Sequence, residues 1–413
     1  MRVVILYQFF QSDFEPGHNL IQAFAKYLRA RGDQVSIVSS EYGYMDPKPI
    51  DAPIWRRVIR QETIDDVSVL RTFSTNYGHS GLRWRFLSIV SFSVSCLLGL
   101  FRGPRPDIIY ASSPPFLPML SAWLASRIRG VPLVIEIRDL WPASLMALSA
   151  PAAKPVVAGM SFLERFLYDK SALIITLTEG IRENIIKRGW RPEKVHTIRY
   201  GVSAERFFPN QAASDRVRAE EGWDHLKIVL YLGAHGLANN LDVVLRAADR
   251  LRARSDIRFV LIGNGIEKKR LMGLAKDLGL SNLVFRDPIS AREAPDYINA
   301  ADLCVATLRD TPLFRGAIPS KLVEYMACGK AVVVGIRGEA EAIVENAAAG
   351  LVFSPSDDAS LARCVENLID APDRRAAMGR GGCTEVQRHF SLQENQAALR
   401  ALLAHVAERR SNT

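Results

Sequence analysis

The sequence is poor in the residues and motifs that mark several common classes of protein. Its 413 residues include only five cysteines, which are scattered and form no CxxC pair. This argues against a disulfide framework and a zinc site, and it predicts a reducing compartment. There is no GxxxxGK[ST], GxSxG or HExxH motif, so a P-loop and the common nucleophilic and zinc-dependent hydrolases are disfavoured. The turn after the first apolar run lacks GxGxxG, which disfavours a nicotinamide-binding first domain.

Acidic residues are fewer than basic ones, most clearly in the first half. The formal net charge is +9, and about +7 of it falls within residues 1–205. An apolar run of 16 residues (86–101) lies between basic residues with no acid, and these are Arg83, Arg85, Arg102 and Arg105. The run is shorter than the about 20 apolar residues that span a bilayer.

Two interpretations of helix 83–105 are compatible with each other. It could cover a sheet as a core helix, or lie on an anionic membrane surface with its arginines at lipid headgroups. Nucleic acid is a weaker explanation of the charge, because no recognition motif accompanies it. Since Met1 leads straight into an apolar run, we also expect no signal peptide before the fold.

Strand-like and helix-like segments alternate along both halves of the chain, which predicts an α/β protein with two doubly wound domains. Strands are predicted at 2–7, 34–40, 54–60, 67–73, 107–112, 132–138, 172–177, 227–233, 258–265, 283–287, 302–308 and 331–336. Helices are predicted at 20–32, 83–105, 162–170, 179–188, 241–254, 266–279, 291–300 and 392–409. A polar stretch near residue 210 suggests domains at 1–210 and 211–390, with a helix in 391–413 packing toward the first. Ligands of such sheets bind at the carboxyl ends of the strands, so we expect a cleft between the domains.

Two glycine-containing turns follow strands in the second half. They are LGAHGLANN, with Gly233 and Gly236, and LIGNGIEKK, with Gly263, Gly265 and Lys268. Glycine allows a backbone to approach a ligand closely, although ordinary strand–helix turns have the same composition. His235 in the first of these turns, and His18 after the first strand, are candidates for ligand contact.

The stretch IPSKLVEYMACGK predicts a short helix with Lys321 and Glu324 on one face. Ser320 is expected to cap the helix start after Pro319, and Gly329 to end it. A cation beside free N–H groups attracts phosphate, and a carboxylate one turn later can accept hydrogen bonds from sugar hydroxyls. This combination suggests a nucleotide-sugar ligand, and the alternative is a Lys–Glu pair on the surface.

Polar residues also follow two neighbouring strands of the first half. Asp139 comes directly after a buried strand, and Trp141 with Pro142 could form a flat wall for a sugar. The alternative is a capping aspartate and a packing tryptophan. In ASSPPF, Ser112 and Ser113 could cap the next helix or donate to a ligand.

Five patterns occur in a fixed order: YASSPPF, RDLWP, LGAHGLANNLD, GNG with a following lysine, and IPSKLVEYMACGKAVV. Over essentially the whole chain this order resembles the GT-B-fold glycosyltransferases of family 4. The likeness is closest to the bacterial group that builds O-antigen, capsule or colanic acid, such as the L-fucosamine transferases. It implies two Rossmann-like domains facing a central cleft.

The resemblance also implies roles for individual residues. Glu324 would hold the donor ribose, and Lys321 with the Gly233–Gly236 turn would lie on the donor diphosphate. The implied catalytic residues are Lys321, Asp139 and His18. The implied donor-binding residues are Gly233, Gly236, His235, Gly263, Gly265, Lys268, Arg286, Asp287, Pro288, Ser320, Lys321 and Glu324. The implied acceptor-side residues are Gly17, Ser112, Ser113, Arg138, Asp139 and Trp141.

Two departures from the family pattern stand out. The first of its paired glutamates would fall at position 316, which is glycine here, and the usual arginine after the Gly233 turn is replaced by Ala234 and His235. Lys321 and Lys268 are therefore expected to supply the positive charge at the diphosphate.

The resemblance implies transfer of a sugar with retained anomeric configuration and without a metal. We expect a UDP-sugar donor, a polyprenyl-diphosphate-linked glycan as acceptor, and a peripheral location on the cytoplasmic membrane face through helix 83–105, with no nucleic-acid partner. Two alternatives stay open at this point. One is a sugar-nucleotide-binding protein without transferase activity, and the other is a GT-B UDP-sugar 2-epimerase, which would not need a membrane-docking helix.

Overall fold

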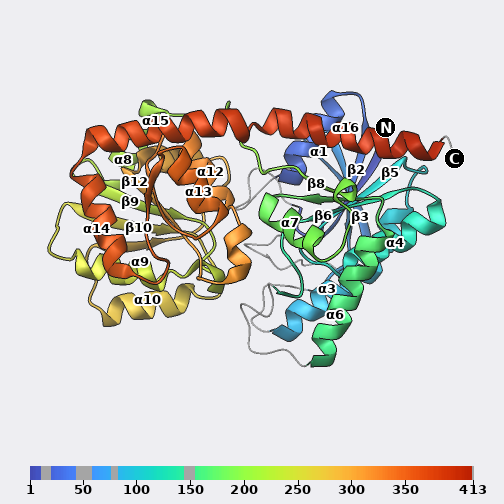
Figure 1. The fold of residues 1–413 in the computed structure, drawn as a ribbon, viewed down its shortest axis with the longest axis horizontal. Helices are drawn as coiled ribbons and strands as arrows, with labels where there is room; N and C mark the ends of the chain where they lie inside the picture. Colours follow the sequence, from blue (N-terminus) through green and yellow to red (C-terminus); the bar gives the residue numbers. More distant parts are fainter. Residues whose placement is uncertain (11–19, 43–57, 76–81, 144–153, 412–413) are drawn as a thin grey trace. The chain divides into compact units, whose positions relative to one another are not determined.

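The protein folds into two compact units, each built around a largely parallel sheet (Figure 1). Unit 1 comprises Met1–Arg199 with Glu394–Thr413, and unit 2 comprises Tyr200–Gln393. The predicted pair of Rossmann-like α/β domains is therefore confirmed. The computed structural model describes residues 1–10, 20–42, 58–75, 82–143 and 154–411.

Unit 1 contains an eight-stranded sheet in the order β3-β4-β2-β1-β5-β6-β7-β8. Every neighbouring pair is parallel except β3 with β4. The strands are β1 (Arg2–Leu6), β2 (Gln34–Ser40), β3 (Ile59–Ile64), β4 (Val67–Thr72), β5 (Ile108–Ser112), β6 (Leu133–Ile137), β7 (Leu173–Thr176) and β8 (Val195–Thr197). The helices are α1 (Leu20–Ala30), α3 (Leu82–Phe101), α4 (Pro118–Arg129), α6 (Lys154–Lys170), α7 (Glu179–Lys187) and α16 (Leu392–Ser411), with the 3₁₀ turn η1 (Pro192–Lys194).

The C-terminal helix α16 completes the core of unit 1. Leu399 and Leu403 lie in the same buried cluster as Ile5 of β1 and Phe24 of α1. Arg400 donates to the buried Asp33, with Nε 2.7 Å from Oδ2. The last helix of the chain is therefore part of the first unit's structure.

Unit 2 contains a six-stranded, wholly parallel sheet in the order β11-β10-β9-β12-β13-β14. In Figure 1, α9 and α10 lie below this sheet and α8 above it. The strands are β9 (Lys227–Leu232), β10 (Ile257–Ile262), β11 (Leu283–Arg286), β12 (Leu303–Thr307), β13 (Val332–Gly335) and β14 (Gly350–Val352). The helices are α8 (Gln211–Glu221), α9 (Asp242–Arg250), α10 (Lys268–Asp277), α11 (Ala294–Ala300), α12 (Ser320–Ala327), α13 (Glu339–Asn346), α14 (Asp358–Ile369) and α15 (Pro372–His389), with the 3₁₀ turns η2 (Leu237–Asn239) and η3 (Pro312–Gly316).

Several helix ends follow directly from the local sequence. At the start of α8, the side chain of Asn210 accepts a hydrogen bond from the backbone N–H of Ala213. At the start of α14, the side chain of Asp357 accepts one from the backbone N–H of Ser360. At the other end of α8, Gly222 adopts the left-handed conformation that terminates many helices, with φ +68°. Gly329 follows α12 with φ +70°, which confirms the predicted helix end.

Three predicted elements were placed wrongly. The strand predicted at 54–60 is β3, Ile59–Ile64, and residues 54–57 lie outside the described part of the chain. β3 pairs with β4 through a two-residue turn at Asp65 and Asp66, both with positive φ. Its polar residues suit an exposed edge strand, and an apolar-run criterion misses them. Helix α6 begins at Lys154 rather than 162, and α3 ends at Phe101, so residues 102–105 follow the helix.

The strand order defines where each sheet can bind a ligand. In unit 2 the chain leaves β9 toward β10 and β11, and then returns to β12 on the other side of β9. In unit 1 the corresponding change of direction lies between β1 and β5. Ligands of open α/β sheets bind at the carboxyl ends of strands beside such a switch point. The turns after β9 and β5 are therefore the expected positions.

Helix α3 has one buried and one exposed apolar face. Phe92, Cys96 and Leu100 are completely buried, while Phe86, Val94 and Leu98 are each more than half exposed. The serines of α3 form bonds within unit 1: Ser88 accepts from Gln8, and Ser95 donates to Thr72. None of the described helices is long and apolar enough to cross a membrane.

Candidate functional site

Lys321 lies at the carboxyl edge of the unit 2 sheet, beside the turn that follows β9. Its Nζ is 2.5 Å from the hydroxyl of Tyr231 and 3.5 Å from Oδ1 of Asn239. The same ammonium lies 3.9 Å from the centre of the Tyr231 ring. Burial lowers the pKa of Lys321 to about 7, and the negative charge of Glu324 only partly opposes this shift. The structure thus brings a half-buried cation to the switch point.

The two glycine turns pack directly on each other beside Lys321. The backbone N–H of Gly233 donates to the carbonyl of Ile262, and that of His235 donates to Asn264. A Cβ on Gly263 would lie 1.9 Å from the carbonyl oxygen of Gly233, and a Cβ on Gly233 would lie 2.8 Å from Lys321 Nζ. Both glycines have φ near +145°. These two positions require glycine for backbone conformation and for space.

Gly265 and Gly236 differ in how strictly they require glycine. A Cβ on Gly265 would lie 2.3 Å from the carbonyl oxygen of His235, so the close packing of the turns extends to this position. Gly236 has an ordinary φ of −107°, and a Cβ there would meet only the Asn239 side chain, at 3.4 Å. The backbone therefore requires glycine at three of these four positions, and the predicted role of the four glycines in donor binding stays a prediction.

His235 is completely buried between the glycine turns. Its ring lies 6.0 Å from that of Tyr231 and 5.9 Å from that of Phe285. Neither ring nitrogen has a hydrogen-bond partner within the described part of the chain. Burial, together with the positive charges of Lys268 and Lys321, lowers the pKa of His235 to about 4. The imidazole is therefore neutral at physiological pH, and its predicted ligand contact stays a prediction.

Lys268, the second cation of the predicted donor site, is already engaged. Its Nζ donates to the carbonyls of Gly263 and Arg286, each at 2.9 Å, and to Asp287 Oδ1 at 2.8 Å. An ammonium has three N–H groups, so these bonds use all of them. Lys268 thus ties the turn after β10 to the end of β11. Contact with a diphosphate would require it to give up one of these bonds.

Arg286, Asp287 and Pro288 follow β11 at the same sheet edge. The guanidinium of Arg286 pairs with Glu221 of α8, which also accepts from the Tyr297 hydroxyl at 2.8 Å. Asp287 is 96% exposed apart from its ion pair with Lys268. Their predicted role in donor binding stays a prediction.

Glu324 lies one turn after Lys321 on α12 and is half-buried. Its Oε1 accepts a hydrogen bond of 2.9 Å from the Tyr200 hydroxyl. Burial raises the pKa of Glu324, and the Tyr200 bond, Arg206 and Lys321 oppose this shift. The predicted capping role of Ser320 is wrong, because Pro319 occupies the cap position and Ser320 is the first residue of the helix.

At the corresponding edge of unit 1, the structure gathers Ser112, Ser113 and Arg138 around a residue that was not predicted, Glu136 of β6. Arg138 Nε donates to Glu136 Oε2 at 2.8 Å, and the Ser112 hydroxyl donates to the same carboxylate. Ser113 Oγ donates to the Glu136 carbonyl at 3.1 Å and accepts from the Arg138 backbone N–H. The serines do not cap α4, whose cap position is Leu117. A carboxylate within the buried run LVIEI was the signal that could have revealed Glu136.

The remaining acceptor-side candidates are less closely held. Asp139 follows Arg138 with an exposed side chain, and Trp141 is half-buried. Arg138 also stacks on Tyr7, with its Cζ 5.0 Å from the ring centre. Gly17 and His18 lie outside the described residues.

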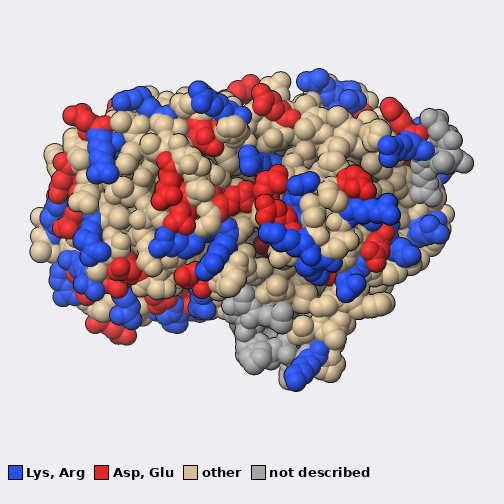
Figure 2. Space-filling model, viewed as in Figure 1, with Lys and Arg blue, Asp and Glu red and all other residues tan. Residues whose placement is uncertain are grey.

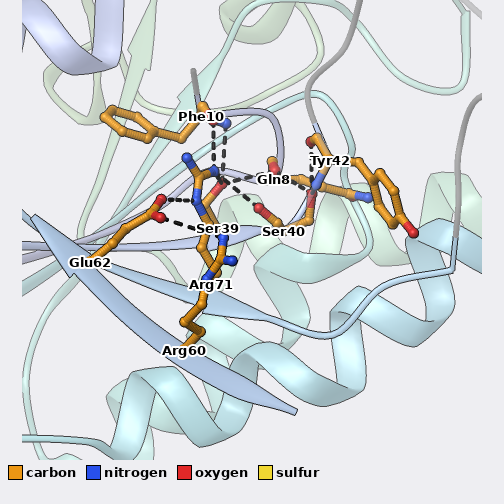
Figure 3. A network of polar contacts seen from close by, with 8 residues as sticks. All are labelled: Gln8, Phe10, Ser39, Ser40, Tyr42, Arg60, Glu62 and Arg71. Carbon is orange, nitrogen blue, oxygen red and sulfur yellow. Dashed lines mark hydrogen bonds and ion pairs between the residues drawn. The ribbon is translucent and has the colours of Figure 1, made fainter. Parts of the chain in front are cut away.

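A buried arginine that the sequence did not reveal, Arg71, holds together the neighbouring part of the same edge of the unit 1 sheet (Figure 3). Arg71 of β4 donates to the carbonyls of Phe10 at 2.7 Å and Ser40 at 3.0 Å, and through Nε to Glu62 at 2.7 Å. The Ser39 Oγ accepts a hydrogen bond of 3.1 Å from the backbone N–H of Phe10. This network fixes the chain directly after β1, at the switch point of the unit 1 sheet.

The five cysteines are free thiols, and Cys96, Cys304 and Cys328 are buried. Burial raises the pKa of the Cys304 thiol to about 12. Within the described ranges, no group of three or more His, Cys, Asp or Glu side chains is arranged to hold a metal ion.

Two Rossmann-like units in one chain, with a cationic, glycine-lined edge on the second sheet, define a protein of the GT-B fold. Residues 18–201 match the family described as glycosyl transferase 4-like domain, and residues 214–383 match the family described as glycosyl transferases group 1. The chain therefore contains a glycosyl transferase 4-like domain followed by a glycosyl transferases group 1 domain, and the prediction of a transferase enzyme is confirmed.

Relatives and one solved structure extend this likeness. The D-inositol 3-phosphate glycosyltransferase of Thermobispora bispora is 28% identical over 323 residues, covering 75% of this chain and 73% of that protein. The putative colanic acid biosynthesis glycosyl transferase WcaI of Escherichia coli is 27% identical over 268 residues, covering 60% and 63%. HepE of Anabaena, solved in complex with UDP and glucose, superposes with a TM-score of 0.74 at 16% identity, covering 98% and 99%. The subgroup that builds O-antigen or capsule stays a prediction.

Proposed function

We propose that the protein transfers a sugar, with retained anomeric configuration, from a UDP-sugar to a polyprenyl-diphosphate-linked glycan during assembly of a surface polysaccharide such as O-antigen or capsule. The observation that carries this proposal is the position of Lys321 over Gly233 at the switch point of unit 2. A cation beside a close-approach glycine suits a diphosphate, which needs both charge and backbone donors.

The choice of donor rests on the fold and on the chemistry of α12. HepE, which shares the fold, is a protein solved with UDP and with UDP-glucose. In this chain, Lys321 and Glu324 lie one turn apart on α12. Lys321 suits the diphosphate, and the Glu324 carboxylate suits the ribose hydroxyls.

The reaction breaks the bond between the anomeric carbon and the diphosphate oxygen and forms a bond from that carbon to the acceptor hydroxyl oxygen. The products are the glycoside, the nucleoside diphosphate and a proton. Negative charge develops on the leaving diphosphate, where Lys321 and the backbone N–H groups of the glycine turns would stabilise it. We assign Asp139 and His18 to the acceptor side.

A lipid-linked acceptor requires the enzyme to reach a membrane surface. Three helices of unit 1 present exposed apolar side chains that could contact such a surface. Of the 14 large hydrophobic side chains that are exposed within the described residues, ten lie on α3, α4 and α6. Helix α4 contacts both α3 and α6. The exposed residues are Trp84, Phe86, Leu87, Val94, Leu98 and Phe101 on α3, Leu124 and Ile128 on α4, and Val156 and Phe162 on α6. Exposed apolar surface gathered in this way is typical of a membrane or protein contact.

The charges around this surface favour an anionic membrane as the partner. Helices α3 and α4 contain no acidic residue. Figure 2 shows a largely uncharged surface at the lower end of α6, with basic atoms at its tip, whereas both signs of charge are interspersed over unit 2. Arg102 is exposed just after α3, while the Arg105 guanidinium donates to the carbonyls of Arg129 and Gly130. We therefore infer peripheral attachment at the cytoplasmic face of the membrane through α3.

Calorimetric titration with UDP, GDP and NAD tests the donor site. UDP should bind, and Glu324→Ala should weaken binding by about 1.5–3 kcal/mol, because a hydrogen bond to a charged acceptor is lost. Binding of GDP in place of UDP would keep the site and change the donor. Unchanged affinity in Glu324→Ala would remove this residue from the nucleotide site.

A further inference from the structure

Glu324 is held by a residue that no motif of the chain reveals. The Tyr200 hydroxyl donates to Glu324 Oε1 at 2.9 Å, across 124 positions in the sequence. Tyr200 is the first residue of unit 2 and is 9% exposed. The carboxylate proposed to receive the donor ribose is thus bonded to the point where the chain enters unit 2.

Tyr200 stands on a rigid base. Two residues on, the Val202 N–H donates to the Phe390 carbonyl at 3.0 Å, and the Leu392 N–H donates to the Val202 carbonyl at 3.2 Å. The intervening Gly201 packs so tightly that a Cβ there would lie 2.6 Å from the Leu392 Cα. The entering and leaving segments of unit 2 are therefore paired, and this pairing fixes the backbone that carries Tyr200.

The Tyr200 bond also bears on the charge of Glu324. Burial favours the neutral form of the carboxyl and raises its pKa. Among the interactions that oppose this shift, the Tyr200 hydrogen bond is the largest, ahead of the charges of Arg206 and Lys321. A neutral carboxyl group is a weaker hydrogen-bond acceptor for a ribose hydroxyl than an ionised carboxylate is.

We propose that Tyr200 is a positioning residue for nucleotide recognition: its hydroxyl fixes the Glu324 carboxylate in the ionised form and orientation that accept the ribose hydroxyls. The proposal rests on the proposed function of Glu324. A carboxylate has about four acceptor positions, so the Tyr200 bond is compatible with simultaneous bonds from a ribose.

The test compares the full-length protein with Tyr200→Phe, which removes only the hydroxyl. Each is titrated with UDP and with 2′,3′-dideoxyuridine diphosphate, which lacks both ribose hydroxyls. Tyr200→Phe should bind UDP about tenfold more weakly, the usual scale for a hydrogen bond to a charged group. Its affinity for the dideoxy compound should change less than threefold. Loss of packing alone would weaken both ligands equally and would overturn the proposal.

Two further measurements separate positioning from general damage. In a Glu324→Gln background, Tyr200→Phe should cost less than threefold in UDP affinity, because the hydroxyl acts through the carboxylate. In Tyr200→Phe alone, the loss of UDP affinity on acidification should begin at a higher pH than in the wild type, since the Glu324 carboxyl loses a bond that favours ionisation. An unshifted pH profile would contradict the proposal.

Failure of this inference is distinguishable from failure of the proposed function. If the wild-type protein binds UDP and Tyr200→Phe binds it equally well, Tyr200 has no positioning role and the donor site stands. If the wild-type protein binds neither UDP nor GDP, the donor site itself is refuted, and the inference falls with it.

Discussion

The ammonium of Lys321 lies 3.9 Å from the ring centre of Tyr231 and 2.5 Å from its hydroxyl. A lysine in this environment loses hydration and has a neutral phenol, not a carboxylate, as its nearest partner. The result is a pKa of about 7 in place of the usual 10.5. Lys321 is therefore poised to change its charge when an anion arrives.

Nucleotide binding should consequently take up a proton. At pH 8, Lys321 is mostly neutral in the free protein, and a bound diphosphate would raise its pKa and restore the ammonium. Calorimetry of UDP binding in buffers with different ionisation enthalpies should show uptake approaching one proton at pH 8 and much less at pH 5.5. Lys321→Met should abolish the uptake. Equal uptake in this variant would assign the proton to another group.

The two glycine turns should respond differently to alanine. Gly263→Ala places a Cβ 1.9 Å from the Gly233 carbonyl oxygen at a φ of +145°, and it should lower the free energy of unfolding by about 2–4 kcal/mol. Gly236→Ala is the matched control, because its φ is ordinary and its nearest neighbour would be 3.4 Å away. Urea denaturation of both variants decides the matter. Similar losses would show that the turns relax easily.

His235 should make stability depend on pH in a defined window. Its pKa is about 4 in the folded protein against 6.5 for the free group, so between these values the unfolded chain binds more protons. Stability should therefore rise with pH from 4 to 6.5, and His235 should account for about 3 kcal/mol of that rise. His235→Leu should flatten the profile measured by denaturant unfolding. The exposed His225→Leu serves as control, and an equal flattening there would contradict the assignment.

The exposed face of α3 should determine vesicle binding. Replacing Phe86, Val94 and Leu98 with serine removes apolar side chains that are more than half exposed, so folding should change little. Binding to vesicles with anionic lipid, measured by sedimentation, should fall at least tenfold, since each side chain contributes about 1.5–3 kcal/mol when buried. The control replaces Ile266 and Met272, exposed residues of unit 2. If the α3 variant still binds the vesicles, α3 does not attach the protein to the membrane and serves only to cover the sheet.

The sequence predicted the features that depend on local spacing. Because Lys321 and Glu324 are three residues apart in a predicted short helix, they were expected to lie one turn apart. The helix α12 confirms this prediction, with ends within a residue or two of those expected. Gly329 ends α12 because the left-handed conformation after a helix favours glycine. The alternation of strands and helices likewise defined both Rossmann-like units.

The partners of those residues could not be predicted, because contacts between distant parts of the chain leave no local pattern. Tyr200 is 124 positions from Glu324, and Tyr231 is 90 positions from Lys321. Lys268 was predicted to supply positive charge at the diphosphate, and the sequence did not reveal that its ammonium is bonded to a turn and to the end of β11. The edge strand β3 was misplaced because edge strands need not be apolar.

Helix α16 has a consequence for the order in which the protein can fold as it is synthesised. Leu399 and Leu403 belong to the core of unit 1, and Arg400 bonds Asp33, which also pairs with the N-terminal ammonium at 2.8 Å. Unit 2, Tyr200–Gln393, contains no such late element and has all of its residues before α16 is complete. During translation, the unit that begins the chain therefore waits for its last twenty residues. The domain made first is finished last, and until then the part of its hydrophobic core that Leu399 and Leu403 complete is uncovered.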